Sequence, residues 1–214
     1  MLRQGQGDNR QGRGIIGFDS IVLERYLILC ERFNATSIGL ILHIRQATQD
    51  DIPALAALVK RSAKALCIRD YTDEQIDAAL RGAWSVDTDL IDDQTYFVCL
   101  DGDQIVGCGG WSRRATLFGG NTYASRDPSF LDPKADRAKI RAFFVDPDFV
   151  GQDIGLSLLN HCETEARKAG FSSFELMATL TGARFYRRNG YDGAERVAFP
   201  VDQNMKIDFI PMTK

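Results

Sequence analysis

The sequence of 214 residues predicts an α/β (α+β) fold. Three observations lead to this prediction. Apolar residues alternate between strand-like and helix-like spacing along the chain, a tight turn motif joins two β-rich segments, and a glycine-bearing turn separates an apolar strand from an amphipathic helix. Hydrophobic residues make up 44% of the chain and charged residues 26%, a composition that suits one ordinary globular domain with an appendage.

Residues 1–43 are predicted to be an N-terminal extension, partly disordered, ahead of a domain that spans residues 44–214. The first 14 residues are mostly Gly, Gln, Arg, Asp and Asn, and such a composition buries too little apolar surface to offset the entropy of ordering. Residues 15–42 are more apolar but lack a clear partner pattern. Two interpretations stay open for them: an accessory helix, or an upstream segment included by a wrong start site.

The expected elements follow in order. They are a strand at 43–47, helices beginning near 50 and 73, antiparallel strands at 95–100 and 104–111 joined by the turn Asp101-Gly102-Asp103, a strand at 140–145, a helix at 154–169, a strand at 171–178, a short helix at 182–189, and strands at 197–199 and 206–210. The strand at 140–145 is apolar almost throughout, which predicts a central position with both faces covered. The connection from 112 to 139 far exceeds the usual ~2 to 5 residues of a hairpin and is typical of a binding or disordered loop.

Charge and cysteine usage exclude several classes of protein. A net charge of -3 and a pI near 5.5 provide no broad positive field, so nucleic acid is not expected as a partner. Five cysteines without a C-x-x-C pair indicate reduced, structural thiols. The apolar run after residue 14 is interrupted by charges, so neither a signal peptide nor a membrane span is expected, and the location is predicted to be cytoplasmic. Two distant histidines and scattered cysteines make no metal site.

The segment from Phe143 to Gly155 carries the chemistry. A strand that feeds a tight turn into a helix exposes backbone N–H groups, because the first helical turn has donors without intrahelical partners and a partial positive charge. Such a turn can bind phosphate. Glycines at 151 and 155 would let the backbone approach a pyrophosphate closely. Alone, the pattern is equally compatible with a plain connection.

The same segment resembles the acyl-CoA-binding motif of the GCN5-related N-acetyltransferase (GNAT) superfamily, Gln/Arg-x-x-Gly-x-Gly/Ala after a strand that ends in Val-x-Pro. Val145-Asp146-Pro147 supplies the strand end, and positions 150–155 fill the loop. Downstream, the stretch from Phe185 to Tyr191 is similar to the family's aromatic-Tyr-x-x-x-Gly-aromatic helix and turn. The stretch from Gln104 to Trp111 is similar to its third strand, so the resemblance covers about residues 44–210.

The resemblance implies a mixed, mostly antiparallel central sheet with helices on both faces, and acetyl-CoA as the acyl donor. The cofactor-binding residues that it implies are Phe144, Val145, Val150, Gly151, Gln152, Asp153, Ile154, Gly155 and Tyr186. Two of these are implied to be catalytic: the backbone N–H of Val145 would polarise the thioester carbonyl, and Tyr186 would protonate the departing thiolate. Arg187 and Arg188 could meet the 3'-phosphate of CoA, although solvated arginines are common.

Two positions depart from the motif. Val150 replaces the polar first residue, but its backbone N–H is retained. Asp153 replaces the middle glycine, and two interpretations are open: its carboxylate repels the pyrophosphate, or its side chain caps the following helix and turns away from the ligand.

The predicted function is an N-acetyltransferase that transfers an acetyl group to a primary amine of a small molecule or peptide by direct attack on the thioester. The alternative is a catalytically silent acyl-CoA-binding or scaffold protein of the same fold, and a homodimer is left open. The general base is not identified: His161 falls on the polar face of its helix, His43 lies at the opening of the first strand, and Glu175 either acts as the base, directly or through water, or simply faces solvent. Residues expected to rim an acceptor pocket, unless they simply pack, are Tyr71, Trp84, Trp111, Arg113 and Arg114.

Overall fold

The computed structural model describes residues 42–116, 119, 127–201 and 205–214. The predictions made for residues 1–41, including the accessory helix and Cys30, lie outside the described residues, as does the middle of the connection after Ser112. Within the described part the first strand begins at His43, and the domain boundary placed between residues 43 and 44 stays a prediction.

Seven strands form one sheet in the order β1-β2-β3-β4-β5-β7-β6. Every neighbouring pair is antiparallel except β4 and β5, which confirms the mixed, mostly antiparallel sheet. The strands are β1 (His43–Gln46), β2 (Tyr96–Asp101), β3 (Gln104–Ser112), β4 (Ala138–Val145), β5 (Phe174–Thr179), β6 (Val197–Pro200) and β7 (Lys206–Thr213). The strand predicted at the centre is β4, the fourth of the seven.

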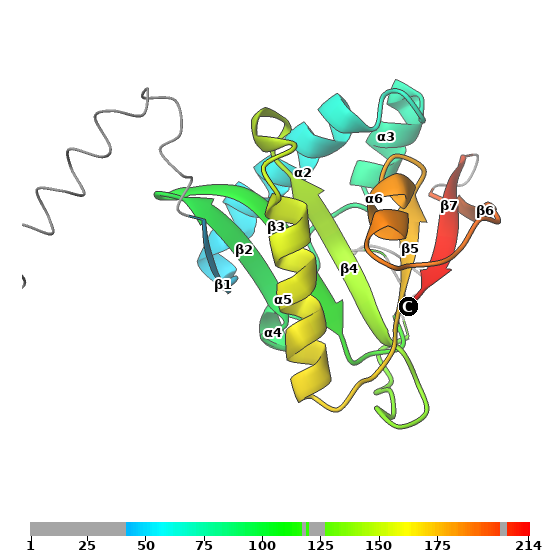
Figure 1. Cartoon of the computed structure of the whole chain (residues 1–214). Helices are drawn as coiled ribbons and strands as arrows, with labels where there is room; N and C mark the ends of the chain where they lie inside the picture. Colours follow the sequence, from blue (N-terminus) through cyan, green and yellow to red (C-terminus); the bar gives the residue numbers. More distant parts are fainter. Residues whose placement is uncertain (1–41, 117–118, 120–126, 202–204) are drawn as a thin grey trace, which may run out of the picture. The chain divides into compact units, whose positions relative to one another are not determined.

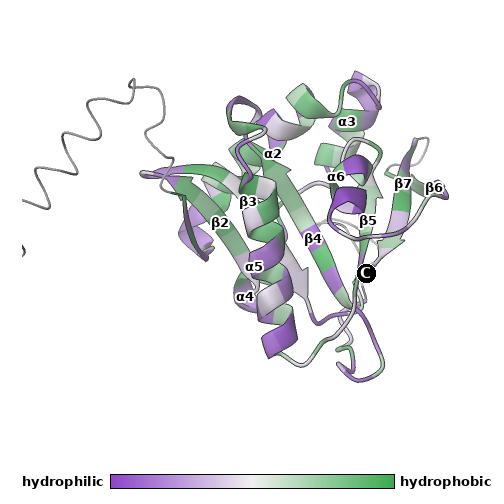
Figure 2. Ribbon diagram, in the orientation of Figure 1, coloured by the Kyte–Doolittle hydropathy of each residue, from purple (hydrophilic) through white to green (hydrophobic). Residues whose placement is uncertain are grey.

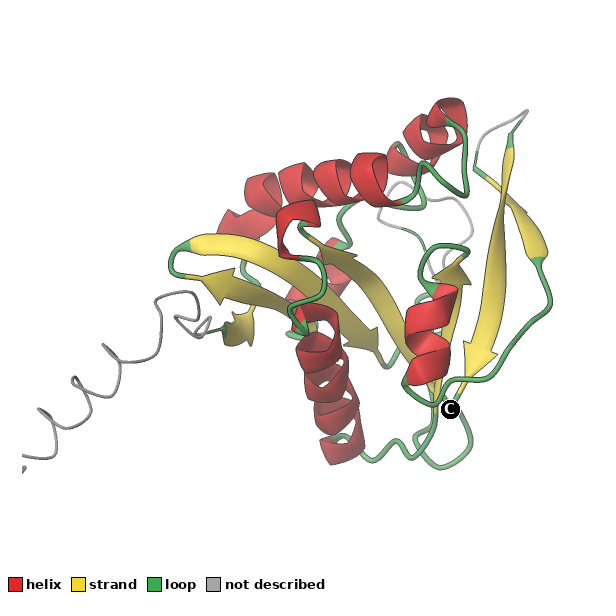
Figure 3. Ribbon diagram, turned by 45° about the horizontal axis from the view of Figure 1, so that its top comes forward, coloured by secondary structure: helices red, strands yellow, loops and turns green. Residues whose placement is uncertain are grey.

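Helices cover both faces of the sheet (Figures 1 and 3), as expected. The helices are α2 (Ile52–Leu66), α3 (Asp73–Leu80), α4 (Thr88–Asp92), α5 (Ile154–Lys168) and α6 (Ala183–Arg188), with 3-10 turns η1 (Gln49–Asp51) and η2 (Pro147–Phe149). Side chains of β2 show the two faces. Tyr96 and Val98 pack in one apolar cluster with α2 and α4, whereas the Phe97 ring between them meets His161 of α5 at 4.4 Å.

Local sequence signals account for the element ends. Thr72 accepts a hydrogen bond from the backbone N–H of Gln75, whose side chain in turn accepts from the Thr72 N–H, so a capping box starts α3. Pro53 occupies the first turn of α2, where its missing N–H is harmless. Gly102 adopts φ 56° in the turn between β2 and β3, a conformation that glycine takes without strain.

Two apolar clusters lie among the described residues of the core. One joins α2 and α4 to β2 and β3, and the other joins α2 and α3 to β7. Figure 2 shows mostly apolar residues along β2, β3, β4 and β5, while α6 carries strongly polar residues on its visible side. The cysteines at 67, 99, 108 and 162 are buried and free of disulfides. No helix in the described part of the chain has the length and apolarity needed to cross a membrane.

Two expectations about the elements need correction. The short helix α4 was not predicted, because its five residues, Thr-Asp-Leu-Ile-Asp, are too few to show a helical period. The strand predicted from residue 171 begins only at Phe174. Phe171 precedes the strand and packs its ring edge-on against Trp111 at 6.0 Å, so an apolar side chain outside the strand extended the β-like pattern.

Candidate active site

The sheet opens between β4 and β5. These parallel strands pair only at their first residues, Ala138 with Phe174 and Lys139 with Glu175, yet β4 continues to Val145 and β5 to Thr179. Figure 1 shows the two strands meeting at their starts and separating toward their ends. The backbone edges that face each other across this gap are therefore not bonded to one another beyond Lys139 and Glu175.

A β-bulge in β4 contributes to this geometry. The register with β3 shifts between Cys108 and Gly110, so that two residues of β4, Ala142 and Phe143, lie opposite one residue of β3. Ala142 has φ 55°, a left-handed conformation that is uncommon for alanine. The bulge needs Gly109 opposite it, because a Cβ there would lie 2.7 Å from the Phe143 ring. Bulges bend the strand that carries them and locally increase its twist.

The N–H of Val145 faces the gap. The next residue, Asp146, donates its N–H to the carbonyl of Val106 across the β3 side at 2.9 Å. Successive N–H groups in a strand point to opposite edges, so the N–H of Val145 points away from β3 and toward the side where β5 has parted. Position 145 is thus suited to donate a hydrogen bond to a group lying in the gap.

The turn after β4 delivers the N-terminus of α5 to the same place. Asp146 is fully buried, forms an ion pair with Arg61, and accepts a hydrogen bond from the N–H of Asp148, which fixes the start of η2. Gly151 follows with φ 86° and Asp153 with φ 58°, and α5 begins at Ile154. The earliest α-helical bond in α5 runs from the N–H of Ser157 to the carbonyl of Asp153. The preceding N–H groups of the first turn are the orphan donors of the helix.

Asp153 occupies the N-cap position of α5, as one of its two interpretations expected. Its side chain, however, makes no capping hydrogen bond, so the interpretation of Asp153 as a side-chain cap is wrong. The residue is exposed, and its left-handed conformation is one that Asp tolerates better than most residues but less well than glycine. The motif position thus keeps the backbone shape that a glycine would give, with a carboxylate added.

A cavity of about 540 Å³ joins these features. It is lined from one face of the sheet by residues of α5 and α6, and from the other face by residues of α2 and of the α3–α4 connection. Because these helices cover opposite faces, the cavity passes through the sheet at the gap between β4 and β5. All predicted cofactor residues line it except Gln152, namely Phe144, Val145, Val150, Gly151, Asp153, Ile154, Gly155 and Tyr186. Gln152 is exposed on the turn.

Gly155 has a packing role that the sequence did not reveal. A Cβ at this position would lie 3.4 Å from the Phe185 ring of α6, so the glycine allows α6 to approach the first turn of α5. At Gly151 a Cβ would meet nothing within 4 Å, and its φ of 86° is the feature that requires glycine.

Tyr186 lies on α6 and lines the cavity. It is half-buried, and its ring lies edge-on to Phe143 at 6.4 Å, to Phe185 at 5.1 Å and to Tyr191 at 5.7 Å. Burial raises the pKa of the Tyr186 phenol above its ordinary value, with the Cys162 thiol adding a smaller effect in the same direction. A phenol held neutral in this way retains a proton that it can donate.

Several candidates named from the sequence lie elsewhere. Glu175 forms an ion pair with Lys139 at the paired start of β5, outside the cavity, which removes it as a base. His161 is half-buried against Phe97, and His43 lies on the edge strand β1. Of the two arginines on α6, Arg187 donates to the carbonyl of Gly193 at 3.0 Å and Arg188 lines the cavity.

The expected acceptor rim is only partly correct. Trp84 lines the cavity and its ring lies 5.6 Å from that of Tyr71. Tyr71 itself is structural, since its hydroxyl donates to the carbonyl of Asp208 and accepts from the N–H of Leu180. The other three residues of the expected rim, Trp111, Arg113 and Arg114, do not line it.

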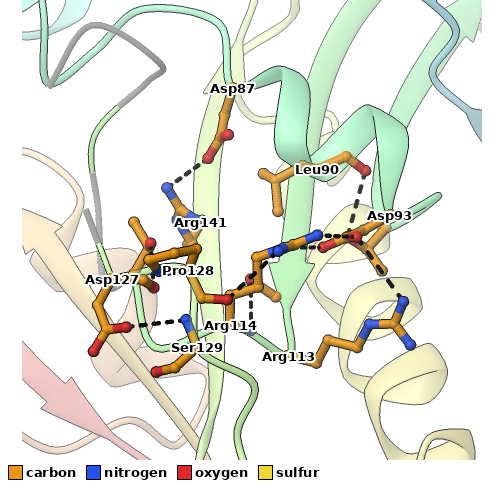
Figure 4. A network of polar contacts seen from close by, with 12 residues as sticks. Asp87, Leu90, Asp93, Arg113, Arg114, Asp127, Pro128, Ser129 and Arg141 are labelled. Carbon is orange, nitrogen blue, oxygen red and sulfur yellow. Dashed lines mark hydrogen bonds and ion pairs between the residues drawn. The ribbon is translucent and has the colours of Figure 1, made fainter.

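Sequence reasoning missed two charged residues of the cavity lining, Asp87 and Arg141. They form a buried ion pair at 2.5 Å, shown in Figure 4. Their distance in the sequence, and the apolar neighbours of Arg141 in β4, left no local signal that could have brought them together.

Parallel strands that part after two paired positions, with a helix N-terminus at the cavity between them, define the fold. Comparison with known proteins identifies it. Residues 92–192 match a family model described as an acetyltransferase (GNAT) domain. This match confirms the resemblance found in the sequence.

Solved structures agree on the fold. A GCN5-related N-acetyltransferase from Rhodopseudomonas palustris is 21% identical, with 80% of this chain and 94% of that chain covered and a TM-score of 0.59. The PaiA N-acetyltransferase from Thermoplasma acidophilum, solved in complex with coenzyme A, is 18% identical over 81% and 98%, with a TM-score of 0.57. An acetyltransferase of the GNAT family from Staphylococcus aureus Mu50 is 14% identical over 81% and 98%, with a TM-score of 0.52. No curated protein sequence matches the chain significantly.

Proposed function

We propose that this protein is an N-acetyltransferase that moves an acetyl group from acetyl-CoA to a primary amine of a small molecule or peptide. The observation that carries the proposal is the cavity through the sheet, which brings the α5 N-terminus, the N–H of Val145 and the phenol of Tyr186 to one channel. The match of residues 92–192 to an acetyltransferase family model and the likeness to a fold solved with coenzyme A support it.

The residues present fit acetyl-CoA. The orphan N–H groups at residues 150–155 and the helix dipole suit the pyrophosphate, and Gly151 leaves the turn open on its outer side. The gap between β4 and β5 is bordered by unpaired strand edges, which suits the amide-bearing pantetheine arm. Arg188 at the cavity offers a cation for the remaining phosphate.

The transfer then follows a single displacement. The acceptor ammonium first loses a proton to solvent, and its nitrogen attacks the thioester carbonyl carbon while the carbonyl oxygen accepts a hydrogen bond from the Val145 N–H. The C–N bond forms, the C–S bond breaks, and the CoA thiolate takes its proton from the Tyr186 hydroxyl. The attacking nitrogen releases its second proton to solvent, and the Tyr186 phenolate regains a proton from solvent. The products are an N-acetyl amide and CoA. A base among the cavity residues is not required when the site lowers the pKa of the amine by desolvation.

One observation favours the alternative of a catalytically silent acyl-CoA-binding or scaffold protein. Asp153 places an exposed carboxylate at the first turn of α5, where the pyrophosphate would lie. Repulsion between the Asp153 carboxylate and the pyrophosphate would weaken the binding of acetyl-CoA, by an amount that depends on how far solvent screens the two charges. The channel is otherwise complete, so we favour the enzyme.

Two measurements test the proposal. Calorimetric titration with acetyl-CoA is expected to show binding at micromolar to millimolar ligand, and a thiol-release assay over a panel of primary amines is expected to show turnover that depends on protein. No uptake of CoA or its acyl forms at millimolar concentration would reject the cofactor site. Binding without turnover of any amine would favour the silent protein. A cytoplasmic location and a homodimer remain predictions.

A further inference from the structure

The cavity has two ends with different chemistry. The α5 and α6 side presents the helix N-terminus and Arg188, whereas the α2 side is bordered by apolar or small residues together with the pair Asp87 and Arg141. Since the cofactor arm enters from the α5 side, the α2 side is the end that remains for the acceptor. This assignment rests on the function proposed above.

At the acceptor end, Asp87 and Arg141 form an ion pair with each other. Arg141 Nη2 lies 2.5 Å from Asp87 Oδ2, and both side chains are only 2% exposed. Arg141 also donates to the carbonyl of Gly119 at 2.7 Å. Asp87 stands at the N-cap position of α4 but makes no capping hydrogen bond there, so its carboxylate is directed to Arg141 instead of to the helix. Figure 4 shows Asp87 and Arg141 pointing toward each other from the α4 segment and from β4.

This ion pair has zero net charge and faces an apolar pocket. Leu66, Trp84, Met177 and Phe209 line this end of the cavity. Among the described lining residues on this side, the only ionisable group besides the pair is the thiol of Cys67, whose pKa is raised by burial. A second charge on the acceptor would be desolvated here with no counter-charge left to meet it.

We propose that the Asp87–Arg141 pair determines acceptor selectivity, and that the acceptor is a primary amine on an apolar, ring-sized skeleton with no second charged group. The pair excludes diamines and amino acids because each of its charges is already neutralised by the other. Trp84 and Phe209 supply the apolar surface that favours the skeleton.

Three probes with the same ring test the selectivity. They are 2-phenylethylamine, phenylalanine, which adds a carboxylate, and 1,4-bis(aminomethyl)benzene, which adds a second ammonium. Thiol release with acetyl-CoA is measured for each, as kcat/KM. The wild-type protein is expected to favour 2-phenylethylamine by about tenfold or more over both charged probes.

Variants of the pair should shift this preference in opposite directions. Arg141→Met leaves the Asp87 carboxylate without its cation, so the ratio of diamine to 2-phenylethylamine should rise by about tenfold. Asp87→Asn leaves Arg141 without its anion, so the ratio for phenylalanine should rise instead. Arg141→Lys keeps the charge and should keep the wild-type order. A merely structural role would lower all three rates together and produce no opposite shifts.

The matched control is Arg114→Met. Arg114 forms a comparable ion pair with Asp93, at 2.6 Å, in the same polar region of Figure 4, but does not line the cavity. Its loss should change stability and leave the three ratios unchanged. If Arg141→Met does not fold, the order of the three kcat/KM values in the wild type and the shift in Asp87→Asn still test the selectivity proposal.

The outcomes separate the two proposals. Wild-type turnover of a charged probe that equals or exceeds that of 2-phenylethylamine would overturn the selectivity proposal and leave the acetyltransferase standing. Binding of acetyl-CoA without acetylation of 2-phenylethylamine would also overturn it. Absence of acetyl-CoA binding in calorimetry would instead reject the cofactor site on which both proposals depend.

Discussion

Asp153 is the single residue at which the sequence departs most sharply from the acyl-CoA motif. It combines φ 58° with an exposed carboxylate at the start of α5. Replacement Asp153→Gly removes both the charge and the left-handed strain, so acetyl-CoA should bind about three- to tenfold more tightly at low ionic strength, with a smaller gain at high salt. Calorimetric titration at two salt concentrations measures this.

Two further variants separate charge from backbone. Asp153→Asn keeps a residue that tolerates the left-handed conformation and removes only the charge, so it should retain most of the gain. Gln94→Gly relieves the same kind of conformation, φ 59°, at a residue that does not line the cavity, and should leave acetyl-CoA affinity unchanged. An affinity of Asp153→Gly equal to or below that of the wild type would show that the carboxylate does not oppose the cofactor.

Tyr186 is the proposed acid, and its raised pKa makes a prediction about pH. Since burial favours the neutral phenol, its proton remains available through the ordinary range of tyrosine titration, near pH 10. Tyr186→Phe should lower kcat on the order of 10²-fold or more while acetyl-CoA affinity changes little. Steady-state thiol release and calorimetry give the two quantities.

Tyr191→Phe is the matched control for this substitution. The Tyr191 ring lies 5.7 Å from that of Tyr186, but its hydroxyl donates to the buried Glu163 at 3.0 Å, so its loss should lower the melting temperature and spare kcat. Equal turnover of the Tyr186→Phe and wild-type proteins would remove Tyr186 from the mechanism.

The site residues that could be predicted from the sequence are those that lie within short local motifs. Positions 150–155 and Tyr186 belong to short segments with recognisable spacing, and the structure brings all of them except Gln152 to the cavity. Asp87 and Arg141 could not be predicted, because their pairing depends on how the chain between them folds. Asp87 also stands close to Asp89, Asp92 and Asp93, and nothing in the sequence distinguishes the one that pairs with Arg141.

At the scale of elements, periodicity predicted most helices and strands because each buries one continuous apolar face. Periodicity could not predict the bulge at Ala142, because every residue from Ala142 to Val145 is apolar. A uniformly apolar run does not indicate which side chains face which side of the sheet. Composition likewise did not predict the gap between β4 and β5. The structure shows it as two paired positions followed by none.

The contact between β3 and α5 depends on Gly107. A Cβ at this position would lie 2.5 Å from Ile154 Cγ2, closer than such atoms approach. Gly107→Ala should therefore push the first turn of α5 outward, lowering the free energy of unfolding by about 1–3 kcal/mol and weakening acetyl-CoA binding. Urea denaturation and calorimetry measure the two effects.

A double-mutant cycle tests the cause. Ile154→Ala removes the clashing methyl group, so Gly107→Ala should cost less in the Ile154→Ala background than in the wild type. If the two losses in the free energy of unfolding are additive, the strain caused by Gly107→Ala does not come from its contact with Ile154.

At the scale of the whole domain, one ion pair ties the edge strand β1 to the start of α2. Arg45 donates two hydrogen bonds to the Asp51 carboxylate, at 2.7 and 2.8 Å, and the N–H of Thr48 donates a third at 2.8 Å. These bonds, chiefly those from Arg45, lower the pKa of Asp51 from 3.8 to about 2 against the opposing effect of burial. Among the described strands β1 pairs only with β2, so this link helps to hold the edge of the sheet.

The lowered pKa makes stability depend on pH in a defined window. A carboxyl whose folded pKa lies below its unfolded value stabilises the fold at pH above about 4, and this stabilisation is lost as the pH falls toward 2. Its size is about 1–2 kcal/mol, since Arg45 is partly exposed and solvent screens the pair. Asp51→Asn should therefore lower the free energy of unfolding at pH 6, and the difference from the wild type should shrink between pH 4 and pH 2.5.

Urea denaturation of both proteins at pH 6, 4, 3 and 2.5 measures that difference. Asp103→Asn, an exposed aspartate in the turn between β2 and β3, serves as the control and should follow the wild-type pH dependence. A loss in Asp51→Asn that stays constant across this range would mean that Asp51 acts through the shape of its side chain. A loss that disappears in acid would instead show that its charge, held by Arg45, fastens β1 to the rest of the sheet.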